Sequence, residues 1–191
     1  KAIELKHDYV EAKLSLEDLV RKQVPKWHIH MMNDHERNTA YLKGVNLAIK
    51  GNEYVLEIGT GSGLLSMMSI DAGAKKVITC ESNKSIATIA NQIISKNGYQ
   101  NKIKVINKKS TELIIGKQLT QKADVIISEI FSSEFVGEGV QSSILDARKR
   151  LLKHNGKLIP ESGEIKFALL KSNSEIDTQC YIDKVNGYDL S

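Results

Sequence analysis

The chain has 191 residues, of which 41% are hydrophobic and 26% are charged, and its net charge is +4. This composition is typical of a globular protein and excludes a disordered, collagenous or coiled-coil chain, while the length predicts one domain with the start of a second. The charge is too small to predict nucleic-acid binding. No apolar run is long enough to predict a membrane span. Two cysteines, Cys80 and Cys180, exclude a disulfide scaffold and indicate a reducing compartment.

The first part of the chain is predicted to be helical. Apolar residues recur at helical spacing before Pro25, so residues 1–26 are expected to form an N-terminal helical segment. A second helix is expected from residue 34 to residue 50, because Tyr41, Val45 and Ile49 share one helical face.

Short apolar runs then alternate with helical segments. The predicted strands are Tyr54–Ile58, Lys76–Cys80, Ile103–Ile106, Ala123–Ser128 and 157–159, and the predicted helices are 64–72, 83–97 and 139–153. This alternation predicts an α/β fold with a mostly parallel sheet and helices on both faces. After Pro160 the pattern changes, and residues 164–170 are predicted to be a strand of another sheet. We therefore expect a domain boundary near Pro160.

A glycine-rich turn separates the first predicted strand from the next helix. Its glycines are Gly59, Gly61 and Gly63, in the spacing G-x-G-x-G. The dinucleotide fingerprint G-x-G-x-x-G would place its third glycine at Leu64. The shorter spacing argues against a pyrophosphate cradle and favours S-adenosylmethionine; a plain turn is the alternative interpretation.

Polar residues follow the other predicted strands. Glu81 comes directly after the second strand, where a carboxylate can accept hydrogen bonds from ribose hydroxyls. Ser110 and Thr111 follow the third strand, and Glu129 follows the fourth. Because the carboxyl ends of parallel strands share one edge of the sheet, these residues are expected to surround one crevice.

The loop after the fourth strand carries two acids nine residues apart, Glu129 and Glu138. Two carboxylates held together repel each other unless a cation lies between them. A guanidinium group is a planar cation that suits this arrangement. A third acid, Glu134, is expected to be a solvated turn residue.

In this combination the sequence resembles the protein arginine methyltransferase family. Residues 55–63 resemble its cofactor-binding motif, Glu81 its ribose-binding acid and residues 128–138 its double-glutamate loop, while residues 31–37 and 186–191 resemble its cofactor helix and an early barrel segment. The resemblance implies a Rossmann-like S-adenosylmethionine-binding domain over residues 27–160 and the incomplete start of a β-barrel domain over residues 161–191. Within the family the chain resembles the tandem-domain, monomethylating branch and its symmetric-dimethylating sister branch.

The resemblance also implies roles for individual residues. Arg37 would pair with the cofactor carboxylate, Met31 would lie near the sulfur, and Ser110 with Thr111 would flank the adenine. The full expected cofactor set is His28, Met31, Arg37, Glu57, Gly59, Gly61, Gly63, Glu81, Ser110 and Thr111. Glu129 and Glu138 would be the catalytic residues, and S-adenosylhomocysteine would be the product of the cofactor.

The chain departs from the family in several places. The family's paired tyrosines on the first helix would fall near Lys22, where there are none, and the barrel loop and dimerisation arm are not reached. An arginine-containing protein or peptide is the implied partner, in a homodimer or a tandem pseudo-dimer located in the cytoplasm or nucleus. No metal is expected, because His28, His30 and His35 lack a metal-binding spacing. A small-molecule methyltransferase and a non-catalytic binding module are the alternatives.

Overall fold

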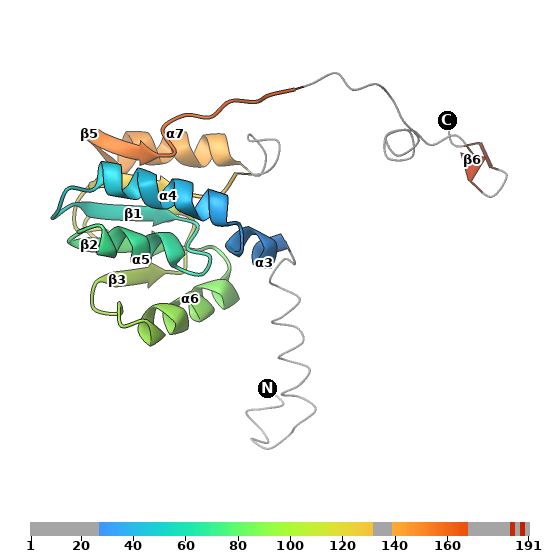
Figure 1. Ribbon diagram of the computed structural model, residues 1–191. Helices are drawn as coiled ribbons and strands as arrows, with labels where there is room; N and C mark the ends of the chain where they lie inside the picture. Colours follow the sequence, from blue (N-terminus) through green and yellow to red (C-terminus); the bar gives the residue numbers. More distant parts are fainter. Residues whose placement is uncertain (1–26, 132–138, 168–183, 186–187, 190–191) are drawn as a thin grey trace, which may run out of the picture.

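The computed structural model describes residues 27–131, 139–167, 184–185 and 188–189. Five parallel strands form one sheet in the order β3-β2-β1-β4-β5 (Figure 1). These strands are β1 (Tyr54–Ile58), β2 (Lys76–Cys80), β3 (Ile103–Ile106), β4 (Ala123–Ser128) and β5 (Leu152–Ile159). The strand order reverses between β1 and β4, which is the position where open α/β sheets bind ligands. The predicted parallel α/β fold is confirmed.

Helices cover both faces of this sheet. They are α3 (Trp27–Met32), α4 (His35–Ala48), α5 (Leu64–Asp71), α6 (Lys84–Lys96) and α7 (Val140–Arg150), with a short 3₁₀ turn η1 at Ser110–Glu112. Buried side chains of α4, α5 and α6 pack on one face, and those of α7 and of the segment after η1 pack on the other (Figure 1). The strands β1, β2 and β4 are buried on both sides, which explains why they are almost continuously apolar.

The structure differs from the predicted boundary between the last helix and β5. The predicted helix 139–153 was too long: α7 ends at Arg150, and β5 begins at Leu152, five residues before the predicted strand. The N–H of Ala123 donates to the carbonyl of Leu151 at 2.8 Å, and Leu152 is the strand partner of Ala123. Pairing with β4 therefore overrides the helical spacing of these leucines.

The predicted strand at 164–170 is wrong over its described part. Residues 161–167 have no regular structure, and the Phe167 side chain is 92% exposed. Further along, β6 (Lys184–Val185) and β7 (Tyr188–Asp189) form an antiparallel pair. The predicted N-terminal helical segment lies outside the described residues, and the barrel domain and the domain boundaries stay predictions. None of the helices in the described ranges is both long enough and apolar enough to cross a membrane.

Candidate functional site

A cavity of about 360 Å³ lies where the glycine turn meets the ends of β2 and β4. Its lining includes Met31, Arg37, Glu57, Gly59, Gly61, Glu81 and Glu129 from the predicted site, together with Met32 and Ile130. Seven of the predicted residues are thus brought together at the carboxyl edge of the sheet. The expectation that residues following different strands surround one crevice is confirmed for Glu81 and Glu129.

The glycine turn needs glycine for two physical reasons. The backbone φ angles of Gly59 and Gly63 are +84° and +82°, a region that L side chains rarely adopt. A Cβ on Gly59 would lie 2.6 Å from Cγ2 of Ile130, and one on Gly63 would lie 2.9 Å from Cγ1 of Ile94. Gly59 and Gly61 line the cavity. Gly63 does not line it; this residue is the N-cap of α5 and lies against α6, so its role is to position the turn.

Glu57 is a buried acid beneath the turn. Its side chain is 1% exposed, and it accepts a hydrogen bond from the hydroxyl of Ser66 on α5. Burial raises the pKa of Glu57 to about 7, although hydrogen bonds from Ser66 and Thr79 act in the opposite direction. Thr79 also bonds Thr60 at 2.7 Å between the two hydroxyl oxygens. Glu57 therefore links β1, β2 and α5 under the cavity.

Glu81 directly follows β2 and lines the cavity beside the glycine turn. The N–H of Asn83 donates to its Oε1 at 2.9 Å, and the N–H of Gly61 lies 3.4 Å from its Oε2. The side-chain amide of Asn107 donates to the carbonyl of Glu81 at 2.8 Å. These contacts hold the carboxylate at the cavity, a position consistent with the predicted ribose contact.

The most informative contact of the site joins Arg37 and Glu129. Nη2 of Arg37 lies 2.9 Å from Oε2 of Glu129, and each side chain is 17% exposed. Asp34 caps α4 by accepting the N–H of Arg37 at 2.9 Å, which places Arg37 in the first turn of that helix. Nη1 of Arg37 donates to Oδ1 of Asn38 at 2.8 Å. Its buried Nε has no hydrogen-bond partner among the described residues.

Tyr41 packs next to this ion pair, and the sequence did not predict this role. Its hydroxyl donates to the carbonyl of Ser128 at 2.9 Å, and its ring centroid lies 5.4 Å from the guanidinium carbon of Arg37. Burial raises the pKa of Tyr41 well above its ordinary value, and the neighbouring Glu129 carboxylate adds to this effect. The sequence signal was the spacing of four residues between Arg37 and Tyr41, which puts both on one face of a helix.

The methionines lie on a separate helix from Arg37. The resemblance implies one helix over residues 31–37, but the helix is interrupted at Asn33 and Asp34, so that α3 carries Met31 and α4 carries Arg37. The carbonyl of Met31 accepts from Nη1 of Arg37 at 3.5 Å. Met32, which was not predicted, also lines the cavity and accepts from the hydroxyl of Ser62 at 3.5 Å.

Four predicted site residues are not brought to the cavity by what the structure describes. Ser110 and Thr111 do not line it; their carbonyls are held by Nη2 of Arg150 on α7, at 3.4 Å and 3.2 Å. The predicted adenine contact of these two residues stays a prediction. Glu138 lies outside the described residues, as does the side chain of His28. No cluster of metal-ligating side chains occurs in the described ranges.

The comparisons with known proteins agree with this geometry. Residues 33–168 match the family model described as "Ribosomal protein L11 methyltransferase (PrmA)". An arginine N(omega)-methyltransferase of Streptomyces achromogenes subsp. streptozoticus is 39% identical over 91% of this chain and 48% of its own length. Protein arginine N-methyltransferase 7 of Aedes aegypti is 40% identical over 71% of this chain and 21% of its own length. The chain thus spans about half or less of these relatives.

A solved structure of a protein arginine methyltransferase has a similar fold. A Trypanosoma brucei PRMT1 enzyme–prozyme heterotetrameric complex with AdoHcy matches 85% of this chain and 51% of its own chain, with a TM-score of 0.69 and 27% identity. The resemblance to protein arginine methyltransferases, including the tandem-domain branch, is confirmed. By its matched model, the chain belongs to the PrmA methyltransferase family, and it is also similar in sequence to arginine methyltransferases.

Proposed function

We propose that the protein transfers a methyl group from S-adenosylmethionine to a guanidine nitrogen of arginine. The observation that carries this proposal is the contact between Glu129 and a guanidinium group, that of Arg37, at 2.9 Å beside the glycine turn. The carboxylate therefore stands where it can accept a guanidinium, and it does so within the cavity that would hold the cofactor.

The residues of the cavity fit this cofactor. The glycine turn brings backbone close to the cavity, because Gly59 leaves no space for a Cβ. Glu81 offers carboxylate oxygens for the ribose, and Arg37 offers a buried Nε with no partner among the described residues for a carboxylate. When bound, the cofactor would supply an electrophilic methyl group on a sulfonium.

The side chains of this chain would align the nucleophile and stabilise its charge. Glu129, with Glu138 of the same loop, would hold the substrate guanidinium and concentrate its positive charge on the nitrogens that face them. The third nitrogen, which these carboxylates would not contact, would stay the more nucleophilic one and would face the methyl group that the bound cofactor would supply. Alignment and preorganised charge supply most of the acceleration in such a reaction.

Arg37 has two roles in this scheme. It is paired with Glu129 in the structure, and it is expected to bind the cofactor carboxylate. Its Nη2 faces Glu129 and its Nε is unpaired among the described residues, so both contacts are compatible with one guanidinium. Arg37 would therefore connect the cofactor to the carboxylate that receives the substrate.

The substrate is the arginine side chain of a protein or peptide in our first proposal. A second candidate is free arginine, because the streptomycete relative, which matches 91% of this chain, is named for arginine and not for a protein. Our proposal of a tandem pseudo-dimer or homodimer is supported by the heterotetramer of the trypanosomal neighbour. The cytoplasmic or nuclear location stays a prediction.

A methyl-transfer assay with labelled S-adenosylmethionine tests this function. Four acceptors should be compared: an arginine-containing peptide, the same peptide with lysine in place of arginine, free arginine and ribosomal protein L11. We expect transfer to the arginine peptide and none to its lysine counterpart. Transfer to free arginine alone would move the substrate to the second candidate. Transfer to none of them, with calorimetry showing that S-adenosylhomocysteine binds, would contradict the proposed activity and favour a binding module.

A further inference from the structure

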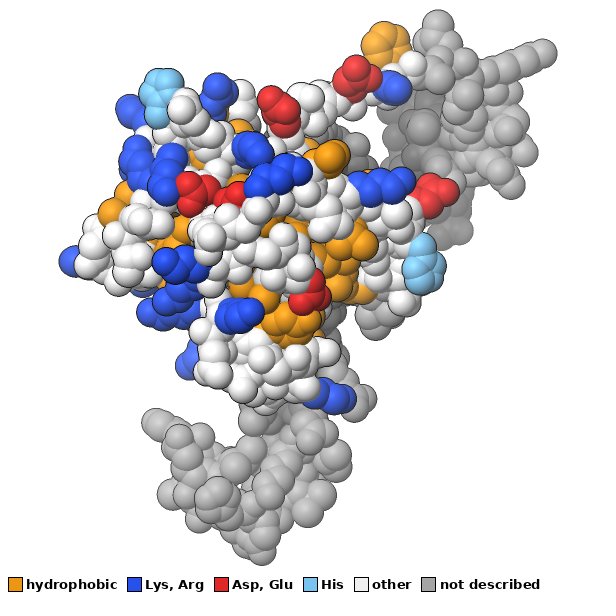
Figure 2. Space-filling view, turned by 60° about the vertical axis from the view of Figure 1, so that its left-hand side comes forward, with side chains coloured by type: hydrophobic (Ala, Val, Ile, Leu, Met, Phe, Trp, Pro, Cys, Tyr) orange, Lys and Arg blue, Asp and Glu red, His pale blue; other side chains and the backbone are white. Residues whose placement is uncertain are grey.

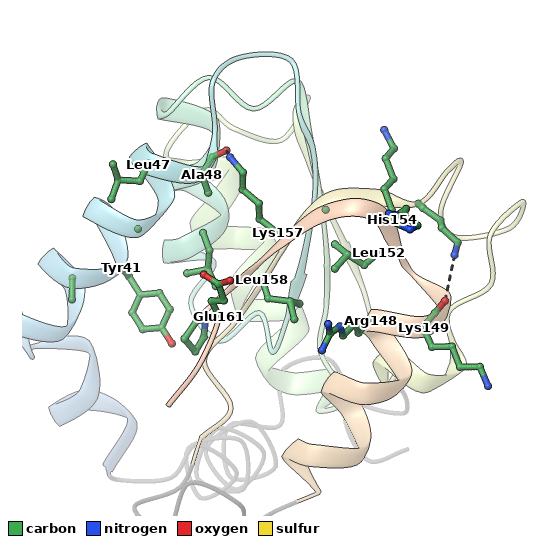
Figure 3. A pocket seen from close by; sticks show the side chains of 17 residues that line it. Tyr41, Leu47, Ala48, Arg148, Lys149, Leu152, His154, Lys157, Leu158 and Glu161 are labelled. Carbon is green, nitrogen blue, oxygen red and sulfur yellow. Dashed lines mark hydrogen bonds between the residues drawn. The ribbon is translucent and has the colours of Figure 1, made fainter. Parts of the chain in front are cut away.

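A second, larger cavity runs along the outer edge of β5. It has a volume of about 1080 Å³ and shares no lining residue with the cavity at the glycine turn. Figure 3 shows its walls: Tyr41, Leu47 and Ala48 of α4 lie on one side of β5, and Arg148 with Lys149 lies on the other. The methyl-transfer chemistry uses none of the charged residues of this groove.

The floor of the groove is a strand edge. In the described part of the chain β5 is the last strand of the sheet and pairs only with β4. An edge strand presents backbone N–H and carbonyl groups that can pair with another extended chain. Peptides are commonly bound in this way, with the backbone giving affinity and the flanking side chains giving specificity.

The walls and the floor carry an unbalanced positive charge. The charged residues that line the groove are Lys122, Arg148, Lys149, Lys153, Lys157 and Glu161. Five cations against one carboxylate give an excess of four, which equals the net charge of the entire chain. All other charges of the chain therefore cancel. Figure 2 shows many Lys and Arg side chains on the surface turned forward, with some acidic side chains between them.

Two of these cations are available to a ligand, because the other three have partners. Lys122 donates to the carbonyl of Lys149 at 3.3 Å. Lys153 is paired with Asp124 at 2.7 Å, and Lys157 donates to the carbonyl of Ala48 at 2.9 Å. For Arg148 and Lys149, by contrast, no acidic partner is found among the described residues, and both are exposed at the last turn of α7. These two are the side chains that an anionic ligand would meet first.

We propose that this groove binds an acidic peptide segment of a partner protein, which adds to the sheet as an extended strand beside β5. A second copy of the chain is disfavoured as the occupant, because it would bring an equal excess of positive charge to the same edge. A nucleic acid would satisfy the cations, but it could not pair with the backbone of β5. Charge and an open strand edge together specify a peptide.

The test is binding of a fluorescein-labelled peptide of alternating Glu and Thr to the full chain, followed by fluorescence anisotropy. The double variant R148E/K149E should weaken binding by roughly tenfold, because two favourable charges become unfavourable at a solvent-exposed site. The matched control is K102E/K104E, which changes the net charge equally at β3, on the opposite edge of the sheet. It should leave peptide affinity within about twofold.

Two further measurements separate strand addition from simple charge attraction. Peptide binding should slow amide hydrogen exchange in residues 152–159, and a peptide N-methylated at alternate residues should bind at least tenfold more weakly. Unchanged exchange with full binding of the N-methylated peptide would overturn strand addition. Equal weakening by both double variants, or tighter binding of a short oligonucleotide than of the peptide, would overturn the proposed site and partner. Affinity for S-adenosylhomocysteine should be the same in both double variants.

Discussion

The two cavities of the domain differ in their charge: the charges are paired in one cavity and in excess of one sign in the other. At the glycine turn Arg37 and Glu129 neutralise each other at 2.9 Å, and Glu57, the acid beneath the turn, is buried. Along β5, five cations face one carboxylate of the lining, and among the described residues Lys153 is the one of them that has an acidic partner. The cavity of about 360 Å³, and not the one of about 1080 Å³, is where the sequence motifs converge. Volume therefore does not identify the reaction site; convergent polar groups on one sheet edge do.

The largest expected effect is the loss of methylation rate when an acid of the first cavity is replaced, compared with the same replacement in the second cavity. Glu129→Gln keeps the shape of the side chain but removes the charge that would pair with the substrate, so the methylation rate should fall roughly a hundredfold or more, the scale for one preorganised electrostatic contact. Glu161→Gln makes the same change in the β5 groove and should leave the rate intact. Both rates are measured with labelled S-adenosylmethionine, beside a calorimetric titration of S-adenosylhomocysteine.

The same replacement at the other acids of this loop tests which two carboxylates are catalytic. Glu138→Gln should resemble Glu129→Gln, whereas Glu134→Gln should leave the rate nearly unchanged. If Glu134 proved essential and Glu129 dispensable, the pair of catalytic carboxylates would have been assigned wrongly.

The next effect concerns the buried acid that distinguishes the first cavity. The pKa of Glu57 is raised by burial from 4.5 to about 7, so the folded chain binds more protons than the unfolded chain between these values. The free energy of unfolding should therefore fall as pH rises from 4.5 to 7, by up to about 3 kcal/mol. Glu57→Gln should remove this slope. Urea denaturation at pH 5, 6, 7 and 8 measures it, and an equal slope in both proteins would assign the dependence to another group.

Two glycines with the same backbone angle give a sharper comparison. Gly59 and Gly98 both have a φ of +84°, but an added Cβ meets Ile130 only at Gly59, because nothing lies within 4 Å of it at Gly98. Gly59→Ala should therefore cost about 1–3 kcal/mol more than Gly98→Ala in unfolding free energy, the scale of overpacking. It should also lower affinity for S-adenosylhomocysteine, which Gly98→Ala should not. Equal costs would show that Ile130 moves aside freely.

The smallest predicted effect concerns the predicted ribose contact. Glu81→Ala should weaken S-adenosylhomocysteine binding by roughly tenfold, as expected for the loss of one set of hydrogen bonds to a charged acceptor. Glu164→Ala removes an exposed acid outside the sheet and serves as the control. Calorimetry on both variants measures the effect. An unchanged affinity for Glu81→Ala would show that Glu81 does not bind the ribose and only contacts Asn83 and Gly61.

Most of the fold follows from local sequence. Four strands were predicted with the bounds that the structure has, because a parallel strand buried on both faces is a continuous apolar run that glycine or polar residues interrupt. The end of α7 was not predictable, because Leu151 and Leu152 are apolar at helical spacing and only their pairing with β4 makes the second of them a strand residue. The exposure of Phe167 was not predictable either, because the apolar pattern of residues 164–170 predicted a strand.

The candidate site divides in the same way. The sequence determined by itself which residues follow each strand, and therefore that Gly59, Gly61, Glu81 and Glu129 share one edge, because parallel topology brings strand ends together. Only the tertiary structure decided which distant groups meet: that Arg37 pairs with Glu129, that the hydroxyl of Tyr41 bonds the carbonyl of Ser128, and that a cationic β5 edge with no further strand among the described residues lies apart from the reaction site. Such contacts join residues up to about a hundred positions apart, and no local pattern records their distance.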